Sequence, residues 1–191
     1  MTDWTDRVRA ALGPDVGLDL DHDPPAVDVA PESWVDTVLA VRDSLGCRFF
    51  DWLSAVDETD AGFRVVCHLA AHRPGSVDHL VVRTLVARAE PTLESVAGVY
   101  AGAAWHERET HEMFGIEFTL DGEPLDLEPL LLSEAFEGHP LRKDFVLASR
   151  VAKPWPGAKE PGESEATPVT TRRRSRPLGV PTPDEWGPRD A

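Results

Sequence analysis

Apolar residues recur at helical spacing in one segment near the start of the chain. In Pro31–Leu45 they follow one another at intervals of four, three and four positions: Trp34, Val38, Val41 and Leu45. This spacing puts them on one face of a helix, and Gly46 suits the position just after a helix ends. A shorter helix is predicted over Trp4–Leu12, where Gly13 followed by proline ends it.

Three runs rich in valine, leucine and phenylalanine come next and predict β-strands. They cover Arg48–Ala55, Phe63–Ala71 and His79–Ala87. The connections contain Gly62 and the pair Pro74-Gly75, which are typical of chain reversals. Because these connections are too short for a crossover, we expect the three strands to pair antiparallel.

Two further helices are predicted after the strands. Pro91–Ala101 begins with a proline and carries its apolar residues at helical spacing, and Trp105–Phe114 follows it. The order of elements predicts an α+β fold. It consists of N-terminal helices, a small and mostly antiparallel sheet, two helices and an extended C-terminal tail.

Composition divides the chain near residue 150. Residues 151–191 hold eight of the 17 prolines, few aliphatic residues and the arginine-rich run Arg172–Arg176. Such a segment cannot bury enough apolar surface to offset the entropy lost on ordering. We therefore expect one α+β domain over residues 1–150 and a Pro-rich extended or disordered tail over residues 151–191.

Charge is concentrated in the expected domain, where 28 acidic residues outnumber 12 basic ones. An acidic body repels phosphate backbones and anionic lipid, so we expect neither nucleic acid nor direct membrane binding, whereas basic protein surfaces are its complement. No apolar run approaches the roughly 18–20 residues of a membrane span, and the first residues lack a signal pattern. We expect a cytosolic chain that reaches a membrane only through a partner.

The chain has two cysteines, Cys47 and Cys67, which lie far apart in the sequence and in apolar surroundings. Free cysteine packs like a small hydrophobic residue, so we expect two buried thiols. An iron–sulfur cluster usually takes four thiolates, and the chain cannot supply them.

The densest cluster of ionisable side chains runs from His106 to Glu112 and leads directly into Met-Phe-Gly-Ile. A zinc site is disfavoured because His106 and His111 are five positions apart, about 140° around a helix, so they do not share a face. Glu109 and Glu112 do share a face and would suit acid–base chemistry, but no nucleophile or orienting partner accompanies them. Two further interpretations remain, a solvated face with an Arg108–Glu112 pair, and an interface or buried ion network, which we favour.

Two motifs taken together resemble the C subunit of NADH-quinone oxidoreductase, the 30-kDa-type protein in the peripheral arm of respiratory complex I. Residues 107–116 read Glu-Arg-Glu-Thr-His-Glu-Met-Phe-Gly-Ile, and residues 137–145 read Glu-Gly-His-Pro-Leu-Arg-Lys-Asp-Phe. The family pattern is Glu-Arg-Glu-x-x-Asp/Glu-Met-Phe-Gly-Ile, then Gly-His-Pro-Leu-Arg-Lys-Asp-Tyr/Phe. Residues 49–57 also look like the first strand of the family, so the resemblance covers residues 30–150.

The resemblance implies a structural subunit that binds no cofactor and has no catalytic residues of its own. FMN and iron–sulfur clusters would lie in partner subunits of a complex that passes electrons from NADH to quinone and translocates protons. The chain would pack against the D subunit, which is similar to hydrogenase large subunits, as a peripheral protein on the cytoplasmic side of the cell membrane. The residues expected at the interface with the D subunit are Glu107, Arg108, Glu109, Glu112, His139, Arg142, Lys143 and Asp144.

The chain also departs from the family pattern. His111 stands where the family usually has an aromatic residue, and residues 122–129 lack two arginines of a Gly-His-Pro-x-Leu-Arg-Arg segment. Two alternatives therefore stay open beside complex I. One is the homologous subunit of a membrane-bound hydrogenase-type complex or of a quinone reductase with another electron donor, and the other is a stand-alone acid–base or metal enzyme.

Overall fold

The computed structural model describes residues 3–13, 16–133 and 136–146 of the 191-residue chain. Met1–Phe145 form one compact unit, and all statements below concern its described residues. The tail predicted over residues 151–191 lies outside them.

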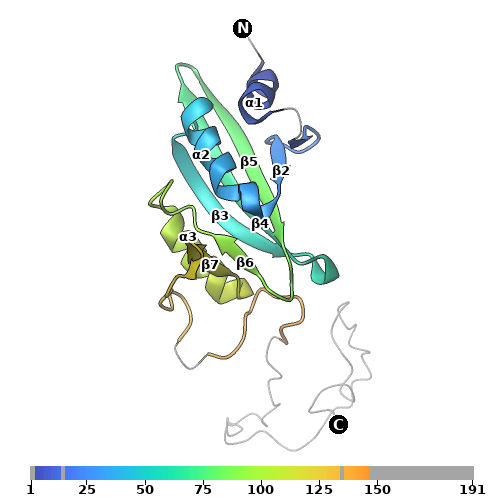
Figure 1. The fold of residues 1–191 in the computed structure, drawn as a ribbon, viewed down its shortest axis with the longest axis vertical. Helices are drawn as coiled ribbons and strands as arrows, with labels where there is room; N and C mark the ends of the chain where they lie inside the picture. The colour runs from blue at the N-terminus through green and yellow to red at the C-terminus, as the bar shows by residue number, and fades with distance from the viewer. Residues whose placement is uncertain (1–2, 14–15, 134–135, 147–191) are drawn as a thin grey trace, which may run out of the picture. The chain divides into compact units, whose positions relative to one another are not determined.

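A five-stranded sheet forms the centre of the unit (Figure 1). Its strands lie in the order β1-β2-β5-β4-β3, with β2 parallel to β5 and the other neighbours antiparallel. The three predicted strands are present and pair antiparallel as expected. The short strands β1 and β2 were not predicted. The bounds are β1 Gly17–Asp19, β2 Ala26–Val29, β3 Phe49–Asp57, β4 Phe63–Arg73 and β5 Ser76–Val86.

Two N-terminal helices are present as predicted. Helix α1 (Trp4–Leu12) begins at Asp3, whose side chain accepts a hydrogen bond from the backbone N–H of Trp4. The second predicted helix starts later than expected, because Pro31–Ser33 form a 3-10 turn before α2 (Trp34–Ser44). Figure 1 shows α2 lying along one face of the five-stranded sheet.

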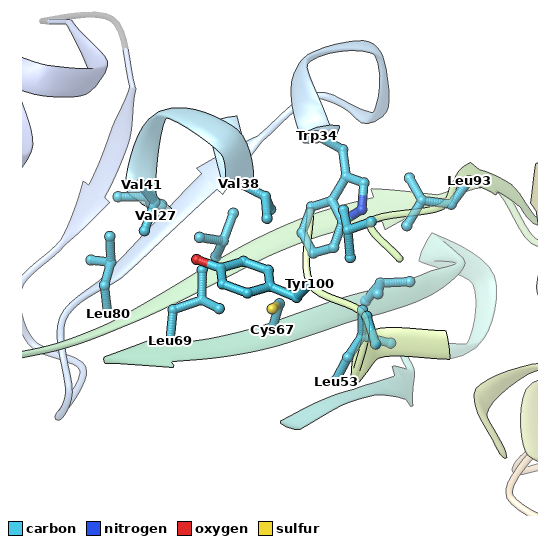
Figure 2. Packing of buried hydrophobic residues seen from close by; sticks show 14 of the residues in the cluster. Val27, Trp34, Val38, Val41, Leu53, Cys67, Leu69, Leu80, Leu93 and Tyr100 are labelled. Carbon is cyan, nitrogen blue, oxygen red and sulfur yellow. The ribbon is translucent and has the colours of Figure 1, made fainter. Parts of the chain in front are cut away.

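The hydrophobic core lies between α2 and the sheet (Figure 2). Alternate residues of β4 point into it, so that Phe63, Cys67 and Leu69 have no exposed surface. They meet the helix face predicted from spacing, on which Trp34, Val38 and Val41 are equally buried. Both cysteines are free and buried, as expected, and burial raises the pKa of Cys47 to about 11.

The prediction of a helix over Pro91–Ala101 is wrong. The segment starts with the short strand β6 (Thr92–Glu94), which pairs in parallel with β7 (Glu117–Leu120), and continues as turns. Strand β7 in turn pairs antiparallel with β8 (Glu123–Pro124), so these three strands form a second small sheet. Pairing with residues about 25 positions away overrides the local helical pattern, because strand formation depends on neighbours more than on intrinsic preference.

A single helix, α3 (Ala103–Phe114), therefore follows the large sheet instead of the two predicted ones. It packs beside the edge strand β3, where the ring of His106 hydrogen-bonds to the carbonyl of Leu53 at 3.2 Å. Covering an edge strand in this way protects it from pairing with other chains. No helix within residues 3–13, 16–133 and 136–146 has the length and apolar character that crossing a membrane requires.

Two residues of β3 test the assignment of the sheet faces. Leu53 is fully buried against the core, whereas Val56 is 50% exposed on the other face. We expect Leu53→Ala to lower the free energy of unfolding by about 2–5 kcal/mol because it leaves a cavity. Val56→Ala is the matched control and should change it by less than about 1 kcal/mol in urea unfolding. Equal losses in both variants would contradict the assignment.

Candidate functional site

The two sequence motifs meet at the C-terminal end of α3. Residues 137–145, called here the capping segment, fold back over the last turn of the helix and supply hydrogen-bond donors to it. The ring of His139 lies 2.8 Å from the carbonyl oxygen of Glu112, and the guanidinium of Arg142 donates to the carbonyls of Phe114 and Gly115. The backbone N–H of Leu141 donates to Met113 as well.

This arrangement supplies hydrogen-bond donors that the C-terminal end of a helix lacks. The last four carbonyl groups of an α-helix have no partner within the helix, and they carry the negative end of its dipole. A cationic donor such as Arg142 satisfies both requirements at once. Gly115 makes the close approach possible, because its φ of 69° is left-handed and a Cβ atom there would overlap the side chains of Arg142 and His139.

Glu112 holds a second loop against the same helix. Its carboxylate is almost buried and accepts hydrogen bonds from three consecutive backbone N–H groups, those of Leu130, Leu131 and Leu132, at 2.7–3.1 Å. Burial by itself raises the pKa of this carboxyl, but the three donors outweigh burial and lower the pKa below its ordinary value. Glu112 is therefore held ionised as an anchor for the loop.

Glu107 faces the opposite way, into the core, and is 1% exposed. Its carboxyl accepts from the hydroxyl of Ser95 at 2.6 Å and from the backbone N–H of Val96 at 2.8 Å. Burial raises its pKa despite these two bonds. Glu107 thus joins α3 to the turn that follows β6.

Asp57, at the end of β3, is a functional residue of the fold that the sequence analysis missed. It is 2% exposed and accepts from the guanidinium of Arg88 at 2.8 Å and from the backbone N–H groups of Thr59 and Lys143. Burial opposes ionisation, but Arg88 and the two N–H groups prevail and lower the pKa of Asp57 to about 2. Arg88 also donates to Asp144, so this cluster ties the capping segment to the sheet.

The alternation of inward and outward side chains along β3 indicates that Asp57 points inward. Leu53 and Ala55 point into the core, and Asp57 has the same parity two positions later. A carboxylate at an inward position of a strand requires a partner, and this expectation would have directed attention to a nearby arginine.

The remaining predicted site residues keep contact with solvent. Glu109 is partly exposed, and the side chains of Lys143 and Asp144 are exposed. Arg108 does not form the pair with Glu112 that a solvated helix face would show. Its guanidinium donates to the carbonyls of Glu128 and Pro129, both at 3.0 Å, and lies over the exposed ring of Trp105.

The two histidines of the helix have separate partners, in line with their spacing. The ring of His106 reaches strand β3, and the ring of His111 lies 2.9 Å from the carbonyl of Ile116. In the part of the chain that the structure describes, no group of three His, Cys, Asp or Glu side chains is arranged to hold a metal ion.

Apolar side chains surround these polar contacts on the outside. Leu131 and Leu141 are more than half exposed, and Phe136 is 42% exposed while it stacks on Phe145. A groove of about 170 Å³ lies next to Phe136 and is bordered also by Glu112, Leu132 and His139. Some of the charged motif residues are thus turned inward, and the surface beside them combines exposed apolar side chains with the exposed Lys143 and Asp144.

Comparison with known proteins identifies the family. Residues 27–151 match the model of the respiratory-chain NADH dehydrogenase 30 Kd subunit. The chain belongs to this family. Its match to the 30 Kd subunit family includes β3, α3 and the capping segment, which are the elements that build the site.

Among the similar curated proteins are two named as the C subunit of NADH-quinone oxidoreductase. The one from Jannaschia sp. (strain CCS1) is 40% identical over 124 residues, which are 63% of this chain and 57% of the relative. The one from Roseiflexus sp. (strain RS-1) is 39% identical over 155 residues, which are 75% of this chain and 83% of the relative. The chain therefore spans little more than half the length of the Jannaschia relative.

Two solved structures share the fold. A chain of the membrane-bound sulfane sulfur reductase, an archaeal respiratory membrane complex, superposes with a TM-score of 0.65 over 86% of this chain and 96% of that chain, at 21% identity. The trypsin-resistant fragment 1–134 of Nqo5 superposes with a TM-score of 0.53 over 64% of this chain and 99% of that chain, at 22% identity. Identities this low establish a common fold only.

The buried carboxylate of Asp57 makes the free energy of unfolding depend on pH in the acid range. Because its pKa is lowered in the folded chain, the stabilisation is complete above the unfolded pKa of about 4 and is lost as the pH falls through about 2. At neutral pH we expect Asp57→Asn to lower the free energy of unfolding by about 2 kcal/mol. The difference from the wild type should shrink between pH 4 and pH 2. Urea unfolding over this pH range measures it. Asp60→Asn, in the exposed turn after β3, should stay within about 0.5 kcal/mol, and a pH-independent gap for Asp57→Asn would contradict the account.

Substitutions at two glycines distinguish the cost of backbone strain from the cost of losing the contacts that cap α3. Gly115 and Gly122 both have left-handed φ angles, but only a Cβ at Gly115 would meet the capping segment. We expect Gly122→Ala to lower the free energy of unfolding by about 1 kcal/mol and Gly115→Ala by about 2–4 kcal/mol. Urea denaturation of both variants checks this. Similar losses at the two positions would show that the cap contributes little.

Proposed function

We propose that this chain is a non-catalytic structural subunit of a proton-translocating NADH-quinone oxidoreductase, complex I. In that assembly, electrons pass from NADH through FMN and iron–sulfur centres of other subunits to quinone. Relatives about 40% identical that are named as the C subunit of this enzyme support the proposal. The assembly places the chain at the membrane as a peripheral protein on the cytoplasmic side.

The observation that carries the structural role is the use of the ionisable motif residues. A catalytic acid or base must reach a substrate, directly or through one water molecule. Here the carboxylates of Glu107 and Glu112 are engaged by groups of the same chain, and His139 and Arg142 donate to the carbonyls of α3. These side chains shape a surface instead of offering a reactive group.

The partner that we propose for this surface is the D subunit of the same complex. The interface would combine the solvent-facing residues Glu109, Lys143 and Asp144 with the exposed leucines Leu131 and Leu141. Apolar residues surrounded by polar ones are typical of protein interfaces. Glu112 fixes the loop at residues 130–132, and the half-buried His139 and Arg142 fix the capping segment. Arg108 holds the same loop at residues 128–129, and the buried Glu107 holds α3 itself against the turn after β6.

NADH is the electron donor that the relatives favour. A hydrogenase-type complex or a quinone reductase with another donor remains the alternative, because the chain lacks two family arginines in residues 122–129. The genes that surround this one distinguish the two cases. Genes for flavin- and NADH-binding subunits would support complex I, and genes for hydrogenase maturation would support the alternative.

An exposed leucine of the proposed interface provides a test. We expect Leu141→Glu to reduce the yield of assembled complex, and the NADH:quinone oxidoreductase activity of membranes, at least about tenfold, because it places a charge in an apolar contact. The variant chain itself should unfold at the same urea concentration as the wild type, since Leu141 is 53% exposed. Affinity purification through another subunit and activity assays of membranes measure the two effects.

The matched control is Leu120→Glu, in strand β7. Leu120 is exposed to nearly the same extent, 51%, but lies outside the loops that the motifs hold. It should leave the yield and the activity within about twofold of the wild type. Normal assembly of Leu141→Glu would reject the proposed interface.

A further inference from the structure

The face of the five-stranded sheet that points away from α2 carries a row of apolar side chains exposed to solvent. Trp52 and Val56 lie on this face of β3 and are 38% and 50% exposed. Leu85, on β5, is 36% exposed and reaches the same row, because Arg64 of β4 lies opposite both Val56 and Leu85. Monomeric soluble proteins rarely leave such apolar residues grouped without a partner.

A groove runs across this face. Its volume is about 310 Å³, and its walls include Trp52, Ser54 and Val56 of β3 together with Val66 of β4. Arg64 and Arg83 border it from the adjacent strands, and His22 closes it from the loop before β2. We call this region the sheet groove.

Trp52 is held in position before any partner arrives. Its ring stacks on His68, with the centroids 5.8 Å apart and the planes at 26°. His68 is fixed on both sides, by Asp51 at 2.8 Å and by the ring of His79 at 3.2 Å. A tryptophan whose rotamer is already set loses little entropy on binding, and tryptophan is a frequent anchor of protein interfaces.

The charges around the sheet groove are acidic on balance. Its two arginines are already paired, Arg64 with Asp28 and Glu58, and Arg83 with Asp28 and Asp19. Three carboxylates thus surround two guanidinium groups. A further carboxylate stands at the Trp52 end, where Asp51 contacts His68 at 2.8 Å, and Asp21 and Asp23 flank His22 in the sequence.

We infer that the sheet groove is a second protein-docking surface, which accepts a segment carrying an apolar side chain flanked by lysine or arginine. The apolar side chain would lie between Trp52 and Val56, and the cations would meet the carboxylates at the rim. This inference rests on the proposed function, since it requires that the chain work within an assembly. The segment belongs to another protein of that assembly, which binds in addition to the contact at the capping segment.

The acidic rim favours a basic protein segment over a lipid surface, a nucleic acid or a second copy of this chain. An anionic lipid surface or a nucleic acid would meet the acidic rim with charge of the same sign. A second copy of this chain bound through the same face would bring two acidic rims together, because a twofold interface pairs identical patches. A basic protein segment meets the opposite charge.

The two native cysteines are buried, so an introduced thiol can be labelled selectively. Full-length chains carrying Val56→Cys or Leu120→Cys are labelled with a maleimide, both as purified chains and within the complex captured through another subunit. We expect assembly to slow labelling at Val56→Cys by about tenfold or more and at Leu120→Cys by less than about twofold. Ser54→Cys, a nearly isosteric change in the same groove, gives a second position in case Val56→Cys impairs assembly.

A maleimide–diazirine linker on the same thiol then identifies the occupant by mass spectrometry. A cross-linked peptide from another subunit, with lysine or arginine next to an apolar residue, supports the inference. Undiminished labelling in the complex, or a cross-link to lipid or to a copy of this chain, overturns it and leaves the proposed function intact. Failure of the wild-type chain to co-purify with any such complex overturns both.

Discussion

The C-terminal end of α3 sets the main constraint on this half of the molecule. Its carbonyl groups need donors, and the capping segment supplies them through His139, Arg142 and the backbone of Leu141. A hydrogen bond from a charged donor such as Arg142 contributes about 1.5–3 kcal/mol, enough to help hold a loop of irregular structure. Glu112 on the helix and Asp57 on the sheet then fix the flanking residues, so a short helix organises residues 125–133 and 136–145, which have little secondary structure of their own.

Much of this architecture could be predicted from local pattern. The spacing of Trp34, Val38 and Val41 predicted α2, and the apolar runs predicted β3, β4 and β5, because burial on one face leaves a periodic trace. Strands β1 and β2 left no such trace, since they have three and four residues and β2 pairs in parallel with the distant β5. Residues 91–101 misled for a related reason, because Leu93, Val96 and Tyr100 are buried at helical intervals although a strand and turns carry them.

The site was predictable in its location but only partly in its chemistry. Motif order pointed to residues 107–116 and 137–145, and the structure joins them directly. The partners were beyond reach of the sequence, because most are backbone groups, which every residue possesses. Density of charge was therefore a poor guide to exposure, because Glu107 and Glu112, in the middle of the charged cluster, are both buried.

The direction of the stabilising bonds has a consequence for synthesis on the ribosome. Asp57, Glu112 and the carbonyls of α3 all accept from residues that come later in the chain, up to 86 positions later in the case of Lys143 and Asp57. The acceptors emerge first and remain hydrated until the donors follow, because a domain is made from its N-terminus. The large sheet and α2 can assemble while the nascent chain is still incomplete, whereas α3 acquires its finished end only when residue 142 has left the exit tunnel.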